Sequence, residues 1–312
     1  MTISEQSYRY ENGRQFYNNK SVAYVLPSDE EESKRVSKQH VLLKAGFGCN
    51  YDAPVRELLE KGILVLDAGC GIFRFAMPSL SANIGLLTIS YVGPAAWTTE
   101  MAKDYPNSTF HGVDIAPRCP TTPPPNCHFH TKNLVEEKPF PDEHLDYIHQ
   151  RLLVLGLPEA NWDKVIAQHM QMLKPGGWIE LVEVTFRVLS NGGPKVTKLM
   201  HAVAKTGTEK GLNMEIPFQL EERLKKAGAV NISMRMAPTP INHGGEIGDL
   251  CWEDFYEAFY SMQTLVAQVH PEMGDADYFK SFLLECKEEC LEYKTSLQWY
   301  RCIGQKPLVV NE

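Results

Sequence analysis

The sequence has little of the features that mark several other classes of protein. Its 31 lysine and arginine residues are scattered among 39 aspartate and glutamate residues, which gives a formal net charge of −8. No dense Lys/Arg block appears, so we expect no broad nucleic-acid surface. The eight cysteines show no C-x-x-C pair, and no apolar signal segment opens the chain. We therefore expect reduced thiols in an intracellular compartment, the cytoplasm or alternatively the nucleus.

A metal site and a membrane span also find little support. Cys286 and Cys290 lie four positions apart on a predicted helix, but no histidine is near enough in sequence to complete a metal site. Helix packing is the favoured interpretation of this pair. The apolar segment 72–93 contains an arginine, a proline and an asparagine, so it is a poor candidate for a membrane span. At 312 residues we expect one large core with additions rather than two independent domains.

Short apolar runs alternate with helical stretches in the first two thirds of the chain. Strands are predicted at about 63–67, 110–114, 127–130, 145–149 and 178–184. This alternation predicts a parallel sheet with right-handed crossovers. Ser28 followed by Glu31 forms a capping box for a helix that runs to about Ala45, and a second helix covers about 53–61.

The pattern becomes mostly helical after Pro194. Helices are predicted at about 195–211, 217–227, 252–270 and 276–296, with strands at 230–236 and 299–304. We expect the helices to cap the carboxyl edge of the sheet and the last two strands to complete the sheet as a hairpin.

The stretch 63–71 (ILVLDAGCG) is typical of a buried strand that ends in a glycine turn. Glycines at 69 and 71 allow a ligand to approach the backbone closely. A second apolar run ends at Asp114, whose carboxylate can accept both hydroxyls of a ribose; an exposed acid at a strand end is the alternative. Asn133 and Leu134 follow the third strand and are candidates to bracket an adenine ring.

The spacing between these elements indicates an insertion. Gly71 and Asp114 are 43 positions apart, whereas one crossing helix needs about 20 residues. Removing the 22 residues Ile72–Gly93 leaves a spacing of 21 and joins the glycine turn directly to a helix. The segment can be encoded with intron donor, branch and acceptor signals, so a translated intron is one hypothesis and a real loop or extra strand is the other. Because the insertion interrupts the ligand loop, we expect it to weaken ligand binding while the fold tolerates it.

Three elements together resemble the class I S-adenosylmethionine-dependent methyltransferases: the glycine turn, the strand that ends at Asp114, and the helix break and strand at 173–181. More specific matches are similar to the fungal LaeA-like and trans-aconitate-methyltransferase-like group. These matches are Asn12-Gly13-Arg14, the stretch 24–32, Arg35, Gln39-His40, Phe140-Pro141-Asp142, the stretch 146–151 and the stretch 304–307. The resemblance implies a Rossmann-like α/β fold with a mostly parallel seven-stranded sheet, an antiparallel last strand and a helical cap.

The resemblance also implies a cofactor and its contacts. S-adenosylmethionine would be bound by Asp67, Gly69, Gly71, Asp114, Ile115, Asn133 and Leu134, with Tyr24, Arg35 and Gln39 toward its carboxylate end. A surface ion pair of Arg35 with Glu31 or Glu32 is the alternative. We expect residues 1–62 to cover the cofactor, 63–190 to bind it, 191–298 to form the cap with one strand, and 299–312 to complete the sheet.

The implied function is methyl transfer from this cofactor to a small molecule, with a protein partner as a further possibility and no membrane contact. A non-catalytic regulator of secondary metabolism is the alternative. His149 and Glu183, at the ends of two predicted strands, are candidates for a base near the reaction site, although a role in the core fits each as well. A nicotinamide oxidoreductase would need a third glycine in the turn, which is missing.

Overall fold

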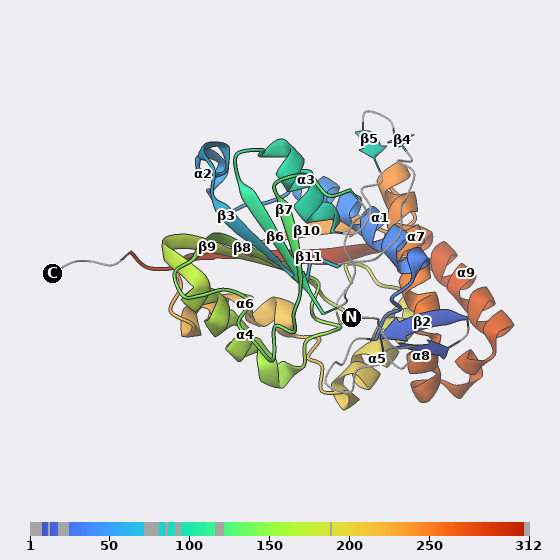
Figure 1. Ribbon diagram of the computed structural model, residues 1–312. Helices are drawn as coiled ribbons and strands as arrows, with labels where there is room; N and C mark the ends of the chain where they lie inside the picture. Colours follow the sequence, from blue (N-terminus) through green and yellow to red (C-terminus); the bar gives the residue numbers. More distant parts are fainter. Residues whose placement is uncertain are drawn as a thin grey trace.

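The computed structural model describes residues 8–11, 13–17, 25–71, 81–84, 87–90, 95–115, 122–187 and 189–308. It contains a central sheet of seven strands with helices on both faces and a group of helices at one end (Figure 1). The spatial order is β10 (Val230–Pro240), β11 (Ser296–Gln305), β9 (Leu173–Val184), β8 (Leu145–Arg151), β3 (Leu64–Ala68), β6 (Thr109–Asp114) and β7 (Cys127–Thr131).

The direction of the strands confirms the predicted fold class. β3, β6, β7, β8 and β9 pair in parallel, whereas β11 runs antiparallel to both of its neighbours. The central strand β3 has the sequence LVLDA, and Val65, Leu66 and Ala68 are fully buried because helices cover both faces of a parallel sheet. A continuous apolar run, rather than an alternating one, is therefore what this position requires.

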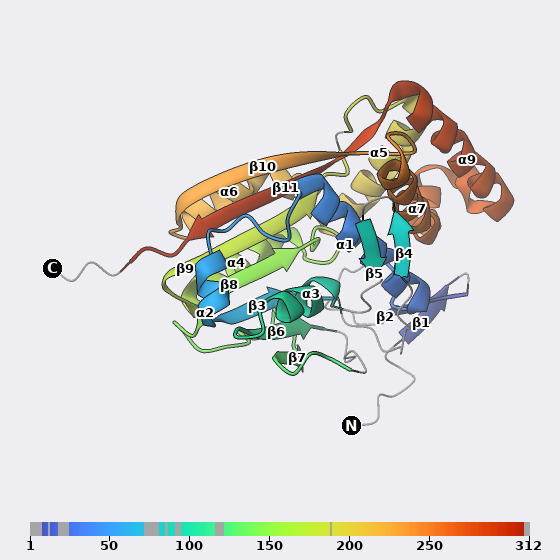
Figure 2. The ribbon, with the colours of Figure 1, turned by 90° about the horizontal axis from the view of Figure 1, so that it is seen from above.

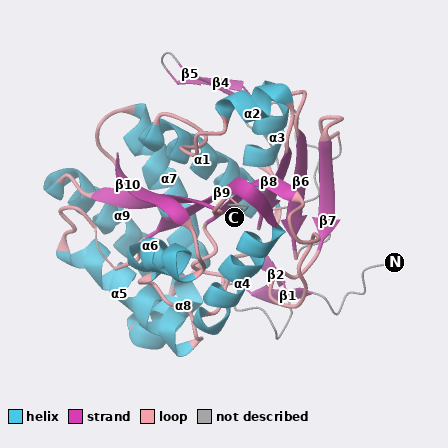
Figure 3. Ribbon diagram, turned by 90° about the vertical axis from the view of Figure 1, so that its left-hand side faces the viewer, coloured by secondary structure: helices cyan, strands magenta, loops and turns pink. Residues whose placement is uncertain are grey.

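Helices cover the two faces of the sheet in two groups. One group consists of α1 (Glu30–Phe47), α2 (Arg56–Lys61) and α3 (Ala96–Asp104). The other consists of α4 (Glu159–Met172) and α6 (Ile216–Lys226). Figure 3 shows the sheet nearly edge-on between these two groups.

The remaining helices form a cap beyond the carboxyl ends of the parallel strands (Figure 2). They are α5 (Pro194–Glu209), α7 (Glu246–Ser261), α8 (Gln263–Val269), the short 3₁₀ helix η2 (Pro271–Gly274) and α9 (Ala276–Tyr293). The helix predicted at 252–270 is in fact two helices that meet at Met262. Because α7, α8 and α9 lie between β10 and β11 in the chain, these strands pair across a long connection and not as the expected hairpin. Cys286 and Cys290 are fully buried on α9.

The start of α1 differs by one residue from its sequence prediction. Asp29, rather than Ser28, caps the helix, and its Oδ1 accepts the Glu32 N–H at 3.0 Å. The same carboxylate accepts two hydrogen bonds from Arg14, at 2.7 and 2.8 Å. Arg14 belongs to β2 (Arg14–Tyr17), so this ion pair anchors the N-terminal hairpin of β1 (Tyr8–Glu11) and β2 on the helix.

The residues that flank the insertion are in contact with each other. Its described parts are β4 (Ser81–Ile84) and β5 (Leu87–Ser90), which pair with each other in a separate two-stranded sheet. The Ala95 N–H donates to the Gly71 carbonyl at 3.0 Å, across the whole insertion. Contrary to the expectation from sequence, the inserted residues therefore do not separate the glycine turn from the start of α3 in space.

Deleting Ile72–Gly93 should preserve the fold. Pro94 alone would then join Gly71 to Ala95, and a bond from the N–H of residue i+2 to the carbonyl of residue i is a γ-turn, so the existing geometry can close. Loop closure costs about 0.6 kcal/mol per doubling of length, so we expect a melting temperature equal to or above that of the full chain. Circular dichroism during heating measures it. A longer deletion that also removes Pro94 should lower the melting temperature, and a loss of more than about 5 °C in the first variant would contradict the expectation.

Candidate functional site

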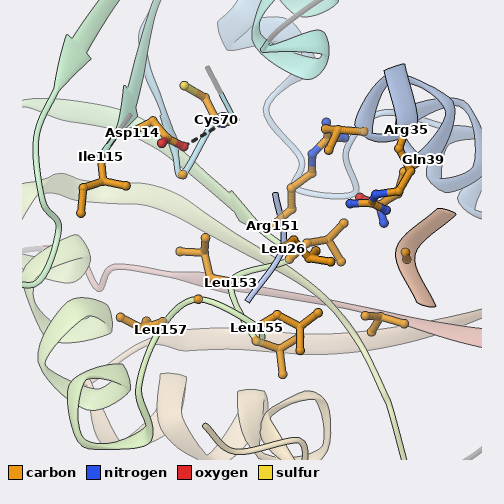
Figure 4. Close-up of a pocket in the computed structure, with 18 of the residues that line it drawn as sticks. Leu26, Arg35, Gln39, Cys70, Asp114, Ile115, Arg151, Leu153, Leu155 and Leu157 are labelled. Carbon is orange, nitrogen blue, oxygen red and sulfur yellow. Dashed lines mark hydrogen bonds between the residues drawn. The ribbon is translucent and has the colours of Figure 1, made fainter. Parts of the chain in front are cut away.

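The carboxyl ends of the parallel strands border a cavity of about 210 Å³ (Figure 4). Its described lining comes from α1, from the segments that follow β3, β6, β7, β8 and β9, from α5 and α7, and from β11. In open α/β sheets, ligands bind outside the carboxyl ends of the strands. The cavity therefore occupies the position that the fold reserves for a ligand.

Most of the proposed cofactor residues line this cavity. They are Arg35, Gln39, Gly69, Gly71, Asp114, Ile115, Asn133 and Leu134. Tyr24 lies outside the described residues. Asp67 is the exception, because it is 2% exposed and is not part of the lining. Its carboxylate accepts the Thr98 hydroxyl at 2.5 Å and lies 3.0 Å from His149 Nδ1. Asp67 thus links β3 to α3 and β8 instead of facing a ligand.

The glycine turn after β3 is compact and close to the loop after β8. Gly69 and Gly71 have φ angles of +75° and +68°, in the left-handed region that favours glycine. A Cβ atom at position 69 would lie 2.6 Å from Leu153 Cδ2. The Gly71 N–H donates to Asp114 Oδ2 at 2.9 Å, which is the dashed line in Figure 4. Backbone and carboxylate therefore meet at one edge of the cavity, with no side chain on the turn glycines to obstruct a ligand.

Arg35 lines the cavity, but its charge is already paired. Its Nε and Nη2 bind Glu32 at 2.9 and 2.6 Å, and its Nη1 binds Asp254 Oδ1 at 2.7 Å. All three side chains are buried, so the Glu32 pairing that the sequence suggested is present but is not a surface feature. Burial raises the pKa of Asp254 to about 6, even though Arg35 attracts the charged form. This cluster joins α1 to α7 and thereby fixes the cap.

Arg151, at the end of β8, also lines the cavity, and in the sequence it is distinguished only as the last residue of the family-like stretch 146–151. Among the described residues no carboxylate forms an ion pair with it, and its Nη1 lies 2.9 Å from His40 Nδ1. Arginine cannot accept a hydrogen bond, so His40 Nδ1 is the acceptor and Nε2 carries the proton. That nitrogen lies 2.5 Å from Glu100. The position of Arg151 at the end of a central parallel strand is the signal that points to it.

The charges around His40 agree with this arrangement. Burial lowers the pKa of His40 to about 4, although the hydrogen bond with Glu100 opposes the shift, so the ring is neutral at pH 7. Burial alone would raise the pKa of Glu100, but His40 and Lys44 outweigh it and lower this pKa to about 2. Glu100 therefore orients the His40 ring, and the neutral ring accepts a hydrogen bond from the Arg151 guanidinium.

The two candidate bases do not line the cavity. His149 is 1% exposed, stacks on Trp97 with ring centroids 3.8 Å apart, and has its pKa lowered by burial. Glu183 is fully buried and accepts the N–H groups of Leu153 and Val154 at 2.9 and 3.1 Å. Burial raises the Glu183 pKa to about 8, a value that would suit a base, but both oxygens hold the loop after β8. Each residue positions its neighbours, so the expectation that they face the reaction site is not met.

Metal-binding clusters and membrane-spanning helices are both absent from the part of the chain that the structure describes. No group of three or more histidine, cysteine, aspartate or glutamate side chains in this part of the chain could hold a metal ion. None of the described helices is both long and apolar enough to cross a membrane.

The sheet and the cavity at its carboxyl edge define a Rossmann-like α/β protein. The profile of the methyltransferase domain family matches residues 48–234, and the chain belongs to this family.

Relatives and solved structures cover different shares of the chain. The N-methyltransferase sirN of Leptosphaeria maculans is 29% identical over 162 residues, which cover 51% of this chain and 49% of that protein. The secondary metabolism regulator laeA of Aspergillus flavus is 26% identical over 252 residues, 76% of this chain and 59% of that protein. This chain thus spans only about half of each. The structure of a SAM-dependent methyltransferase from Archaeoglobus fulgidus matches with a TM-score of 0.47 and 13% identity, over 88% of this chain and 97% of that one.

Replacing Asp114 should weaken binding of S-adenosylhomocysteine, the product form of the cofactor. In Asp114→Ala the Gly71 N–H and the ribose lose a charged acceptor, worth roughly 1.5 to 3 kcal/mol per bond, so we expect a loss of at least tenfold. Asp114→Asn keeps one oxygen acceptor and should lose less. Isothermal titration calorimetry measures both variants, with Asp142→Ala on an exposed loop as the control. Unchanged affinity in a folded Asp114→Ala variant would remove this residue from the site.

The buried Asp254 should make stability depend on pH. Its folded pKa of about 6 exceeds the ordinary 3.8, so its contribution is fully present below pH 3.8 and is lost as the pH rises through about 6. A shift of two units corresponds to about 3 kcal/mol. Relative to the wild type, Asp254→Asn should therefore gain up to about 3 kcal/mol in unfolding free energy between pH 4 and pH 7. Urea titrations at several pH values measure this, with the exposed Asp277→Asn variant as the control; parallel pH profiles would contradict it.

Proposed function

We propose that this protein transfers a methyl group from S-adenosylmethionine to a small molecule. The observation that carries the proposal is the cavity at the strand ends, where a left-handed glycine turn meets the Asp114 carboxylate. Membership of the methyltransferase domain family supports it. When bound, the cofactor supplies an electrophilic methyl group, so the work of the protein is to align the two reactants and exclude water.

We assign the adenosine half of the cofactor to the end of the cavity near β6 and β7. Asp114 would accept the ribose hydroxyls, as a carboxylate with two oxygens can. Ile115 and Leu134 would flank the adenine ring with apolar surface. The Asn133 side-chain oxygen already accepts the Val135 N–H at 3.0 Å, so this residue would meet the adenine through its NH₂ group.

We assign the carboxylate end of the cofactor to Arg151 rather than to Arg35. All three guanidinium nitrogens of Arg35 bind carboxylates already, whereas the described partner of Arg151 is the neutral His40. Figure 4 shows Arg151, Arg35 and Gln39 on the side of the cavity opposite Asp114 and Ile115. A planar guanidinium held in place by a neutral ring is well suited to bind a carboxylate in two-point contact.

A second candidate function is regulation without catalysis. The similarity to the regulator laeA favours it, and the insertion beside the glycine turn is compatible with it. The two functions differ in one measurable respect, because a regulator of this kind can bind the cofactor yet leave every acceptor unmethylated.

Two ligands that differ only in the amino-acid part test both the proposal and the role of Arg151. Calorimetry should show that the wild type binds S-adenosylhomocysteine and, more weakly, 5′-methylthioadenosine, which has no carboxylate. Arg151→Met should weaken the first ligand about 10- to 100-fold, because a charged hydrogen bond is worth about 1.5 to 3 kcal/mol, and leave the second within about threefold. Lys132→Met removes another lining cation, which pairs with Glu137, and serves as the control.

The outcomes of these titrations distinguish the proposed function from the role of Arg151 and from the effect of the insertion. A wild-type chain that binds neither ligand would overturn the proposed function. Equal losses for both ligands in Arg151→Met would instead show that Arg151 supports the structure of the site. Repeating the titrations with the variant that lacks Ile72–Gly93 tests the insertion: because Gly71 and Ala95 already meet, we expect affinities within about threefold of each other.

A further inference from the structure

The cavity extends well beyond the residues assigned to the cofactor. Its lining runs from Asn133, after β7, to Leu297 and Trp299 on β11. These two strands are five positions apart in the order of the sheet, which corresponds to about 24 Å at about 4.8 Å per strand spacing. The assigned cofactor contacts come from α1 and from the segments after β3, β6, β7 and β8. The part that reaches β9, β11 and the cap, here called the acceptor end, is left for a second ligand.

The acceptor end is lined by apolar side chains from five parts of the fold. They include Leu157 after β8, Phe186 after β9, Met200 on α5, Phe255 and Phe259 on α7, and Trp299 on β11. The indole N–H of Trp299 is already used, because it donates to Thr239 Oγ1 at 3.0 Å. These aromatic and aliphatic surfaces favour a ligand that buries rings or alkyl groups.

The charged side chains beside the acceptor end bind one another, but a single guanidinium faces two carboxylates, so the excess charge is negative when Asp254 is ionised. Arg35 and Asp254 border it, and they bind each other at 2.7 Å within the cluster that includes Glu32. An anionic ligand would have to leave water and approach this excess negative charge, which is unfavourable. Charge therefore selects against anions at this end, while apolar contact favours neutral molecules.

Among the described side chains at the acceptor end, Asp254 is the one that could accept a proton, and its Oδ1 already accepts a hydrogen bond from Arg35 at 2.7 Å. His149 and Glu183 lie behind the lining, and the oxygens of Glu183 are held by the amides of Leu153 and Val154. A ligand whose reacting atom already carries an available lone pair at neutral pH fits such a site. A weak acid that must first be deprotonated does not.

We propose that the acceptor end binds an uncharged, ring-bearing apolar small molecule, and that this is the substrate class of the protein. The inference deepens the proposed function and rests on it for the identity of the neighbouring cofactor. The binding preference itself follows from the cavity lining and can be measured without any turnover.

Two probes with one skeleton test the preference. 2-Naphthalenemethanol is neutral and 2-naphthoate is anionic at pH 7.5, and each is titrated into the full chain with and without saturating S-adenosylhomocysteine. We expect the neutral probe to bind at least tenfold more tightly than the anion in the presence of S-adenosylhomocysteine. Equal or tighter binding of the anion would overturn the proposal, and so would a failure of the neutral probe to bind below 1 mM.

A filling variant shows where the neutral probe binds. Ala258 lines the acceptor end on α7, so Ala258→Trp should weaken the neutral probe at least tenfold and leave S-adenosylhomocysteine within threefold. Ala276→Trp, on the exposed first turn of α9, is the matched control and should change neither affinity. If circular dichroism shows that Ala258→Trp is unfolded, the smaller change Ala258→Leu should still weaken the probe at least threefold. Unchanged probe binding in the folded variant would overturn the assignment of the site.

Different results would contradict the proposed function and the proposed substrate class. A chain that binds the neutral probe at Ala258 but not S-adenosylhomocysteine would retain the acceptor end and lose the proposed function. A chain that binds S-adenosylhomocysteine but discriminates against the neutral probe would retain the proposed function and lose the substrate class.

Discussion

The site depends on one tight turn, formed where β3 ends. Gly71 donates its N–H to Asp114 and accepts the N–H of Ala95, so the end of β6 and the start of α3 converge on a single residue. Its neighbour Gly69 packs against Leu153, where a Cβ atom would be too close. Both glycines have positive φ angles, which other residues rarely adopt. The turn thus determines where the edge of the cavity lies and how closely a ligand can approach the backbone.

Two arginines near the cavity have different roles because their partners differ. Arg35 is the single positive charge between two buried carboxylates, and removing it would leave both without a counter-ion, which is strongly destabilising. Arg151 is held by a neutral histidine, so its charge is available to a ligand. Arg35 joins the cap to α1, and Arg151 places a positive charge in the lining of the cavity.

The insertion shows why distance along the chain is a poor guide to distance in space. It adds 22 residues between the glycine turn and α3, yet Gly71 and Ala95, on either side of it, are joined by a hydrogen bond. The cost of closing a loop rises only with the logarithm of its length, so an outlying hairpin places little strain on the core. With the segment present, the glycine turn keeps its hydrogen bonds to Asp114 and Ala95.

Local sequence determined the sheet and half of the site. A continuous apolar run marks the central strand β3 because a buried parallel strand needs apolar side chains on both faces, and Gly69 and Gly71 follow where that run ends. Asp114 likewise stands at the end of β6. Tertiary structure alone decided what depends on partners distant in the chain. Asp254 meets Arg35 across 219 positions, and Arg151 meets His40 across 111. Asp67, His149 and Glu183 turn inward because neighbouring strands and loops supply their hydrogen bonds. A strand's sequence indicates that it is buried, but only packing against its neighbours determines whether a polar side chain at its end faces the ligand or the core.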